Sequence, residues 1–476
     1  MPLILPSNSI SAVGYEVDNS LRFNSGSSDS LSKAFSSNGT RTKWTWSIWF
    51  KRSKLSGSNV LGACYFNDSN EDRLEIDSNG QMIWYSYQSN SYVGRLKTNR
   101  KFRDISAWYH LVLRWDTGDS TADNRMKIWI NGVEETSFAI RNNPSSDAES
   151  LFNYGNGSQQ WVIGHTANVN HWGGYMAEIV FCDNQKLDPT SFGEFDEDTG
   201  IWKPIDVSGL TFGTNGFYLD FENSGSLGAD VSGNGNNFTV NNLTSIDQTT
   251  DTCTNNFATW NPLHSGTTLF TNVAFKDGNT TFDNNESGTG VYPVGFSSIG
   301  VSQGKWYCEI KFIADVGTAL TLGIEEGLSD TTYGGIKSTG IAYKCGDGQI
   351  RKNNSDSSYG NTYTVGDIIG IALDLDNNYI YFSKNGTWQN SGDPTSGATG
   401  TGGVSVVAVS STTTGVYHFS ISDNSSSGTF EISANFGNPP YTISSGNSDG
   451  NGYGNFEYAV PSGYYALNTK NLAEYG

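Results

Sequence analysis

The stretch Lys43-Trp-Thr-Trp-Ser-Ile-Trp-Phe50 alternates large apolar side chains with side chains of other kinds. Successive side chains of a β-strand point to opposite faces, so one face of this stretch carries four large apolar residues: Trp44, Trp46, Ile48 and Phe50. Trp49 falls on the opposite face. The pattern predicts a strand of an antiparallel sheet whose first face is buried in a core.

Runs of the same kind recur along the chain, separated by Gly, Asn and Asp, which favour tight turns. They cover residues 108–115, 127–130, 175–181, 304–310, 320–324, 340–343, 366–382, 403–409 and 430–436. Hairpin turns are expected at residues 376–378 and 384–386, because Asn385-Gly386 suits a type I′ turn. The pattern predicts an all-β protein with two consecutive antiparallel β-sandwich (jelly-roll) domains.

The length of 476 residues is too great for one core and fits two large sandwiches. We expect an N-terminal attachment segment (1–17), a first sandwich (18–221), a connecting segment rich in Gly, Asn and Ser (222–263), a second sandwich (264–443) and a C-terminal tail (444–476). The domain boundary is expected near Pro262. One helical turn is expected at residues 188–193, with Asp188 as its cap and Pro189 at its first position.

The charge balance argues against a nucleic-acid partner. Lys and Arg number 28 and Asp and Glu number 48, which leaves a formal net charge of −20. A surface of this sign repels phosphate backbones. The acidic residues are spread over many turns, as in a solvated, soluble surface.

The cysteines and the first residues bear on where the protein folds. Five widely spaced cysteines lack a metal-binding motif, so we expect them to be free and buried in a protein made in a reducing cytoplasm: Cys64, Cys182, Cys253, Cys308 and Cys345. Residues 1–6 lack the cationic and long apolar parts of a signal peptide or membrane span. Neither export through a signal peptide nor membrane insertion is expected.

Five phrases of the first half, at residues 20–23, 44–51, 108–113, 127–132 and 173–179, occur in the order found in concanavalin A-like, laminin-G-type lectin domains, and this half resembles them. Four further phrases, at 187–194, 199–204, 216–221 and 230–236, resemble such domains in tailed-phage structural proteins. The resemblance implies a lectin-type sandwich that belongs to a virion.

In the second half, residues 306–310, 366–374, 380–386 and 435–437 resemble the SPRY domain, a β-sandwich interaction module. The ending, with phrases at 459–464 and 467–469, also resembles phage proteins that pair these two domains. Neither family names a ligand, because one fold serves many functions. In the resembling modules, loops at one end bind the partner, which makes Trp388 a candidate exposed anchor for protein binding.

Concanavalin A-like folds include glycoside hydrolases, which use paired carboxylates. In residues 71–77, Leu74 and Ile76 would face the core, and the outward residues would be Glu71, Arg73, Glu75 and Asp77. This resembles the Glu-x-Asp-x-Glu pattern of one hydrolase class, but position 79 is Asn79, so the third carboxylate is missing. We expect no enzymatic activity, and a glycan depolymerase that uses Glu75 is the alternative.

Aromatic faces and amide groups typically bind sugars. Strand parity places Trp49 and Trp129 on the outer face of the first sandwich, with Arg114 beside them, as one candidate carbohydrate site. The alternative is that both indoles pack under long loops or against a neighbouring subunit. The preferred contact surface is the loop at 164–173, whose candidate residues are His165, Asn168, Asn170, His171 and Trp172.

One hypothesis places a calcium site in the loop at 230–237, where Asp230, Asn234 and Asn236 carry side-chain oxygens at alternate positions. One charged ligand is few, so an Asx-turn loop without a cofactor is the better expectation. The histidines are scattered along the sequence, and no Gly-x-Ser-x-Gly motif occurs in it. The sequence therefore does not indicate a nucleophilic triad.

The expected function is that of a virion-surface protein of a bacteriophage, in a tail fibre or other appendage. Its expected partners are host-surface glycan, neighbouring virion proteins and further copies of itself, since symmetric homo-oligomers are common. A capsid decoration protein with a purely structural role is a further alternative.

Overall fold

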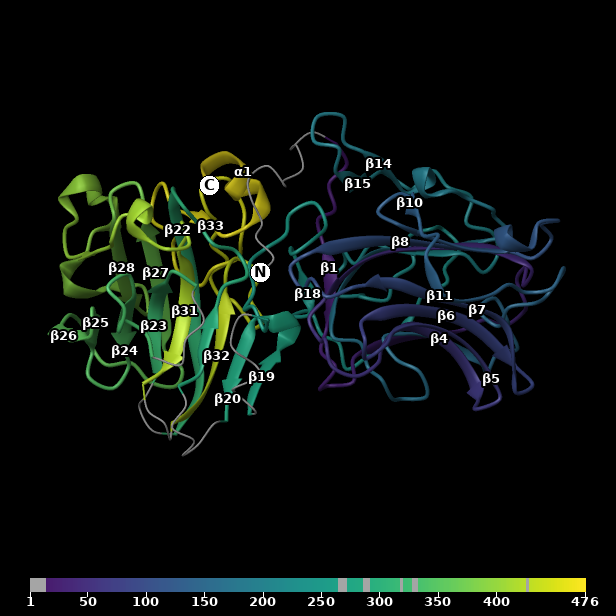
Figure 1. The fold of residues 1–476 in the computed structure, drawn as a ribbon, viewed down its shortest axis with the longest axis horizontal. Coiled ribbons are helices and arrows are strands. Elements are labelled where there is room, and N and C mark those ends of the chain that lie inside the picture. Colours follow the sequence, from purple (N-terminus) through teal and green to yellow (C-terminus); the bar gives the residue numbers. More distant parts are fainter. Residues whose placement is uncertain (1–13, 264–271, 286–291, 317–319, 328–332, 425–427) are drawn as a thin grey trace. The chain divides into compact units, whose positions relative to one another are not determined.

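The computed structural model describes residues 14–263, 272–285, 292–316, 320–327, 333–424 and 428–476 (Figure 1). The described chain forms two compact units, and it passes from one to the other between Thr254 and Asn255. We call these units the first sandwich and the second sandwich. Both consist almost wholly of antiparallel sheets, which confirms the predicted all-β fold.

One sheet of the first sandwich, here called the β3 sheet, has the order β10-β9-β8-β3-β13-β1-β18, with β16 beside β13. Its strands are β1 (Ser20–Phe23), β3 (Lys43–Arg52), β8 (Trp108–Asp116), β9 (Met126–Ile130), β10 (Val133–Glu134), β13 (Gly174–Asp183), β16 (Phe217–Leu219) and β18 (Gln248–Thr249). The other sheet, the β5 sheet, has the order β11-β7-β6-β5-β4-β12-β2-β17. Its strands are β2 (Ser30–Ala34), β4 (Asn59–Asn67), β5 (Asn70–Ile76), β6 (Gln81–Gln88), β7 (Ser91–Lys101), β11 (Phe138–Asn142), β12 (Gln160–Ile163) and β17 (Thr239–Asn241).

The core of the first sandwich lies between these two sheets, where strand parity predicts it. The predicted apolar face of β3 is fully buried there, with 0% exposure at Trp44, Trp46, Ile48 and Phe50. The opposite face of the β3 sheet is buried too. It is covered by the chain from about residue 187 to 218, which includes the small hairpin β14 (Gly193–Phe195) and β15 (Trp202–Pro204).

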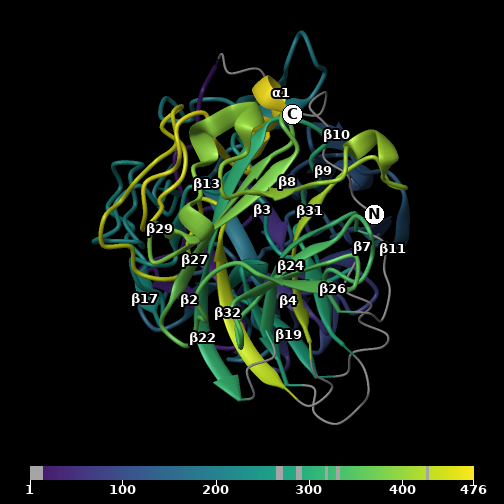
Figure 2. The same ribbon diagram turned by 90° about the vertical axis from the view of Figure 1, so that its left-hand side faces the viewer.

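The second sandwich also has two sheets. The β22 sheet has the order β19-β20-β32-β22-β27-β28-β29, with β30 beside β28 and β33 beside β22, and the β23 sheet has the order β21-β31-β23-β24-β25-β26. Figure 2, turned by 90° from Figure 1, shows strands β22, β27 and β32 of this unit. The β22-sheet strands are β19 (Val273–Lys276), β20 (Thr281–Asn284), β22 (Lys305–Val316), β27 (Ile368–Asp374), β28 (Tyr379–Lys384), β29 (Thr387–Trp388), β30 (Val404–Ser405), β32 (Thr429–Asn435) and β33 (Tyr465–Ala466). The β23-sheet strands are β21 (Val294–Phe296), β23 (Leu320–Glu325), β24 (Ile341–Lys344), β25 (Gln349–Lys352), β26 (Ser355–Ser358) and β31 (His418–Asp423), and one helix, α1 (Thr469–Tyr475), ends the chain.

Both predicted hairpin turns are confirmed. Strands β27 and β28 pair in antiparallel register across residues 375–378. Strands β28 and β29 pair across Asn385 and Gly386, whose φ values are 49° and 78°. Positive φ at both central residues is the geometry of a type I′ turn.

The prediction that the connecting segment and the C-terminal tail are separate from the two sandwiches is wrong. Residues 222–254 belong to the first sandwich, because β17 and β18 extend its sheets and Leu227, Phe238 and Leu243 enter its core. Residues 444–476 belong to the second sandwich, where Leu467 and Leu472 enter the core. Both segments look loop-like because their apolar residues are sparse, yet several of these residues are buried in a core. The boundary lies at residue 254, before the predicted Pro262.

Other expectations concern smaller features. Of the expected attachment segment at 1–17, residues 1–13 lie outside the described residues, and Val17 is buried against the β3 sheet. The predicted helical turn is a 3-10 turn at Pro189–Ser191, but Asp188 does not cap it, since its carboxylate binds Arg114 instead.

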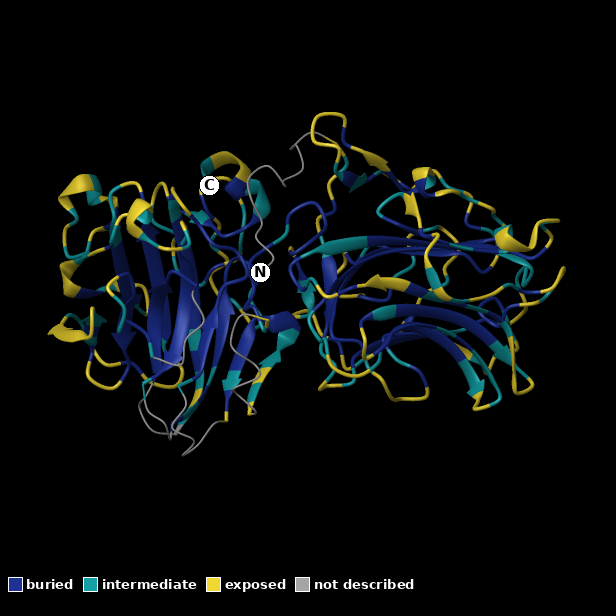
Figure 3. Cartoon of the chain, in the orientation of Figure 1, coloured by how far each residue is buried: buried dark blue, intermediate teal, exposed yellow. Residues whose placement is uncertain are grey.

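The burial pattern in Figure 3 shows dark-blue sheets bordered by exposed loops. All five cysteines are buried and free, as predicted. Within the described residues, no helix has the length and apolar character that crossing a membrane requires.

Candidate functional site

The candidate site lies on the face of the β5 sheet that points away from the core. The strand register aligns one outward residue from each of six strands in a single row: Ser32, Val162, Ala63, Arg73, Tyr85 and Arg95. Residues next to them in sequence, such as Leu74, Trp84 and Leu96, lie in the core. In Figure 1, strands β4 to β6 arc so that this outer face is the concave one. We call the six residues the outer row.

The middle of the outer row carries charge. The Arg73 guanidinium lies 3.4 Å from a Glu71 carboxylate oxygen and 3.6 Å from one of Glu75. It also lies 5.1 Å from the centre of the Tyr85 ring, whose hydroxyl donates to Glu71. Both carboxylates thus share one cation, which leaves a net negative charge on these three groups, and the cation is held against an aromatic face.

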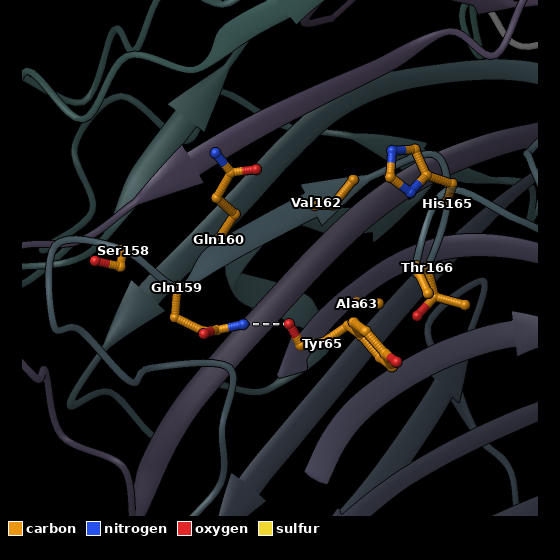
Figure 4. A pocket seen from close by; sticks show the side chains of 9 residues that line it. Ala63, Tyr65, Ser158, Gln159, Gln160, Val162, His165 and Thr166 are labelled. Carbon is orange, nitrogen blue, oxygen red and sulfur yellow. Dashed lines mark hydrogen bonds between the residues drawn. The ribbon is translucent and has the colours of Figure 1, made fainter. Parts of the chain in front are cut away.

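Beside this charged cluster the surface holds a cavity of about 230 Å³, which we call the β4–β12 pocket (Figure 4). It is lined by Ala63, Tyr65, Ser158, Gln159, Gln160, Val162, His165, Thr166 and Ala167. The adjacent residues Ala63 and Val162 of the outer row are 1% and 9% exposed. In Figure 4 Gln159 reaches toward Tyr65, whose backbone carbonyl accepts a hydrogen bond from the Gln159 amide, while His165 and Thr166 lie on the other side.

A tight turn holds the polar wall of the pocket in place. Thr166 and Val169 exchange two backbone hydrogen bonds, of 3.2 and 2.7 Å. The two residues between them, Ala167 and Asn168, have φ values of 44° and 56°. Such a two-residue turn with positive φ at both positions matches the twist of a hairpin. The turn directly follows His165 and Thr166, which lie just after the end of strand β12.

The electrostatics of this wall follow from burial. Burial, with a smaller contribution from the nearby His171 ring, lowers the pKa of His165 to about 4. The imidazole is therefore neutral at pH 7. The Thr166 hydroxyl donates to a Glu71 carboxylate oxygen at 3.2 Å, so the nearest charge along the wall is negative.

The predicted loop at 164–173 contributes in part. His165 lines the pocket, Asn168 and Asn170 are exposed, and His171 is half-buried with a ring nitrogen 3.2 Å from the carbonyl of Asn168. The prediction of Trp172 as a contact residue is wrong, because this side chain is 0% exposed and packs edge-on against Phe50 in the core. The loop turns inward at this indole, and this anchors the loop to the sandwich.

The first predicted carbohydrate site, formed by Trp49, Trp129 and Arg114, is wrong. The two indoles do lie on the outer face of the β3 sheet, but they are only 3% and 6% exposed. The covering chain at 187–218 buries Trp129 with Phe192 and Phe212, and it brings Trp202 over Trp49. Arg114 is buried as well and pairs with Asp188 at 2.5 Å. The alternative, packing under long loops, is confirmed.

The candidate protein anchor Trp388 is half-buried and packs against a cluster that includes Tyr381 and Phe456. It is therefore not the exposed anchor that the loop suggested. Its partner Phe456 comes from the C-terminal segment, which folds back onto the β22 sheet.

The loop at 230–236 is an Asx-turn network. Both carboxylate oxygens of Asp230 accept backbone hydrogen bonds, from Tyr218 at 2.9 Å, Ser232 at 2.9 Å and Asn236 at 2.7 Å. The amide nitrogens of Asn234 and Asn236 donate to backbone carbonyls of residues 213–216. Both oxygens of Asp230, the one charged candidate ligand, therefore hold backbone N–H groups within the first sandwich. Among the described residues, no three His, Cys, Asp or Glu side chains converge as a metal site.

The carboxylates of the hydrolase-like pattern are also tied into the sheet. Burial would raise the pKa of Asp77, but hydrogen bonds from Lys97 and from the backbone of Gln81 and Asn79 outweigh it and hold this pKa below its usual value. Burial raises the pKa of Glu75, against the opposing effect of Arg73. As predicted, Leu74 and Ile76 face the core.

Several residues of the site were not predicted, among them Ala63, Tyr65, Gln160, Val162 and Tyr85. Strand parity could have placed each of them on an outward face. The adjacency of β4 and β12, which are nearly a hundred residues apart in sequence, has no local signal. Without that pairing, the outer row and the pocket cannot be assembled.

Comparisons with known proteins agree with this architecture. Residues 15–186 match the family described as the Concanavalin A-like lectin/glucanases superfamily, and residues 305–420 match the SPRY domain. The chain therefore contains a concanavalin A-like domain followed by a SPRY domain, which confirms the resemblance to both. Among curated proteins, no match was found.

Three solved structures illustrate the similarity. The SPRY domain of human HERC1 is 16% identical, with a TM-score of 0.28, over 37% of this chain and 96% of that domain. A heptameric SAP-like pentraxin from Limulus polyphemus is 14% identical, with a TM-score of 0.27, over 36% of this chain and 78% of its own. A putative carbohydrate binding protein from Bacteroides ovatus is 13% identical, with a TM-score of 0.32, over 48% of this chain and 59% of its own.

Proposed function

We propose that this chain is a surface protein of a tailed-phage particle, in a tail fibre or another appendage, and that its first sandwich binds host-surface carbohydrate. The observation that carries the carbohydrate proposal is the β4–β12 pocket beside the charged outer row, on the concave face of a lectin-type sandwich. A small cavity with an apolar floor and converging polar groups is the usual form of a ligand site.

The virion setting rests on other support. The phrases at residues 187–194, 199–204, 216–221 and 459–464 resemble those of tailed-phage structural proteins. In this setting the second sandwich, a SPRY domain, contacts a neighbouring virion protein, and several copies of the chain assemble together.

Binding without cleavage is part of the proposal. Asp77 is held by two backbone N–H groups and Lys97, and Glu75 lies beside Arg73, so both carboxylates already serve the sheet. Position 79, where the related hydrolase pattern has its acid, is an asparagine. A reducing-sugar assay on host envelope glycans tests this point. Sugar release that disappears in Glu75→Gln would overturn it in favour of a depolymerase.

The binding test uses the purified full chain on a panel of host-envelope glycans. The double variant Gln160→Ala/His165→Ala removes two polar groups of the pocket, and we expect its Kd to rise at least about tenfold. The matched control is Val133→Ala, at an exposed residue of strand β10 in the other sheet. A blank panel, or equal binding by the double variant, would contradict the carbohydrate proposal.

The virion setting has its own test. Mass spectrometry and immunogold labelling of purified particles are expected to find the chain on the particle surface. Particles that lack the chain would rule the setting out. A blank glycan panel together with particles that lose stability on deletion of the chain would instead support a purely structural decoration protein.

A further inference from the structure

The chemistry of the β4–β12 pocket narrows the class of its ligand. Its floor consists of the aliphatic side chains of Ala63 and Val162, which lie side by side in the outer row. A hydroxyl group placed on such a floor finds no hydrogen-bond partner, whereas a methyl group gains apolar contact. The floor therefore favours a ligand that carries a methyl group on an otherwise polar body.

The rim of the pocket suits an amide. The carboxamide of Gln160 on strand β12 is exposed and can both donate and accept a hydrogen bond. The hydroxyl of Ser158 and the neutral imidazole of His165 add further donors or acceptors around the same cavity. An amide group needs one acceptor for its N–H and one donor for its carbonyl, and this rim supplies both.

Charge at the pocket disfavours an acidic ligand. The nine lining residues, all within the described part of the chain, include no lysine, arginine or acidic residue. The nearest cation along the outer row, Arg73, is already balanced by Glu71 and Glu75. Glu71 itself accepts the hydroxyl of the lining residue Thr166 and thereby places negative charge next to the cavity. A carboxylate or phosphate in the pocket would gain no cationic partner and would meet like charge.

We propose that the β4–β12 pocket binds an uncharged, N-acetylated sugar residue, whose acetamido methyl group lies on Ala63 and Val162 while its amide faces Gln160. This inference rests on the proposed carbohydrate-binding function and names the ligand class of the same pocket. The remainder of the glycan runs along the outer row toward Arg73, whose side chain is 20% exposed and can donate hydrogen bonds to its hydroxyls.

The test compares three oligosaccharides of equal length by isothermal titration calorimetry with the full chain. One contains N-acetylglucosamine, one glucose and one glucuronic acid. The acetylated ligand is expected to bind at least about tenfold more tightly than the glucose ligand, because one buried methyl group discriminates by about this factor. The glucuronic acid ligand is expected to bind most weakly.

Two variants separate the floor from the charge. Val162→Thr replaces a methyl group by a hydroxyl at nearly constant shape, and it is expected to abolish most of the preference for the acetylated ligand. Val133→Thr is the matched control, since it makes the same replacement at an exposed position of the other sheet. Gln160→Lys, at an exposed residue, places a cation at the rim and is expected to raise the affinity for the glucuronic acid ligand.

The outcomes distinguish this inference from the proposed function. Equal or stronger binding of the glucose or glucuronic acid ligand overturns the ligand class and leaves carbohydrate binding in place. A preference for the acetylated ligand that survives Val162→Thr unchanged overturns the placement of the methyl group in this pocket. The absence of binding to any of the three ligands and to the host-glycan panel overturns both proposals.

Discussion

At the scale of single residues, the buried imidazole of His110 shows how an apparently functional side chain serves the fold. Its ring stacks on Trp49 with centroids 4.6 Å apart. The indole N–H of Trp202 donates to Nδ1 at 2.9 Å, so Nδ1 is unprotonated and Nε2 donates to the Ser47 hydroxyl at 2.8 Å. This one ring therefore joins the covering chain at 187–218 to the β3 sheet.

The burial of His110 makes stability depend on pH. Burial lowers its pKa to about 3 in the folded protein, from an ordinary value of 6.5. Below pH 6.5 the unfolded chain binds a proton that the folded chain does not, so this stability is present above that pH and is lost as the pH falls toward 3. The slope from this group is about 1.4 kcal/mol per pH unit.

Chemical denaturation of the wild type and of His110→Gln between pH 4 and 7 measures that slope. The variant keeps a donor and an acceptor at the site but does not titrate, so its free energy of unfolding is expected to fall less steeply on acidification. Identical slopes for the two proteins would contradict a neutral, buried imidazole.

The ion pair between Lys51 and Asp251 gives a second prediction at this scale. Their side chains are 1% and 0% exposed, and the charged atoms are 2.8 Å apart. Lys51→Ala leaves a buried carboxylate without its cation and is expected to cost about 3–5 kcal/mol of unfolding free energy. The double variant Lys51→Met/Asp251→Leu, which removes both charges, is expected to lose much less in the same urea titration. Equal losses would show that packing, not charge balance, dominates here.

At the scale of elements, turns and covering segments decide which faces are free. The loop at 164–173 supplies His165 to the pocket, and the tight turn at Ala167 and Asn168 keeps the loop short at this wall. The segment at 187–218 has the opposite effect, because it removes Trp49 and Trp129 from solvent. Strand parity identifies the face of a side chain, but it does not show what lies over that face.

The turn between β28 and β29 gives a prediction at this scale. Gly386 has a φ of 78°, and a Cβ there would meet the Tyr458 ring at 2.6 Å. Gly366 also has a positive φ, 93°, but a Cβ there would meet nothing within 4 Å. Both Gly→Ala variants suffer the backbone cost of about 1 kcal/mol, and Gly386→Ala is expected to lose clearly more in thermal unfolding. Equal losses would mean that the Tyr458 contact is easily relieved.

At the scale of the whole molecule, each unit has its own core and recruits a segment that looks like a linker. The first sandwich includes residues 222–254, with strands β17 and β18 and the carboxylate of Asp251. The second includes residues 444–476, whose backbone N–H groups at Glu457 and Tyr458 donate to the buried Glu309 at 2.9 and 2.7 Å. Because of these contacts, each segment is needed for the stability of its own unit.

Fragments test this division of the chain. Residues 10–254 and 255–476 are each expected to be soluble and to unfold cooperatively. The shorter fragments 10–221 and 255–443, which follow the boundaries expected from sequence, are expected to aggregate or to lose several kcal/mol, because apolar core positions and buried charges lose their partners. Circular dichroism and thermal unfolding give the comparison. If the short fragments were as stable as the long ones, the two segments would be linkers and the prediction would be wrong.

The sequence by itself determined the strands, their buried faces and two of the turns, because these depend on residues close together in the chain. Period-2 alternation places Trp44 and Trp46 inward, and the pair Asn385-Gly386 favours a type I′ turn. The two domain families were also readable from short phrases. The loop residue His165 was the one predicted contact residue that the structure places in the pocket.

Only the tertiary structure decided which faces stay open and which residues meet. The outer row joins the consecutive strands β4 to β7 to strand β12, which is distant from them in sequence, so no local pattern reveals the pocket between β4 and β12. The exposed tryptophans expected on the β3 sheet are buried because a later segment covers them. Side-chain direction is a local property of the backbone, whereas solvent exposure depends on every segment that folds over that side chain.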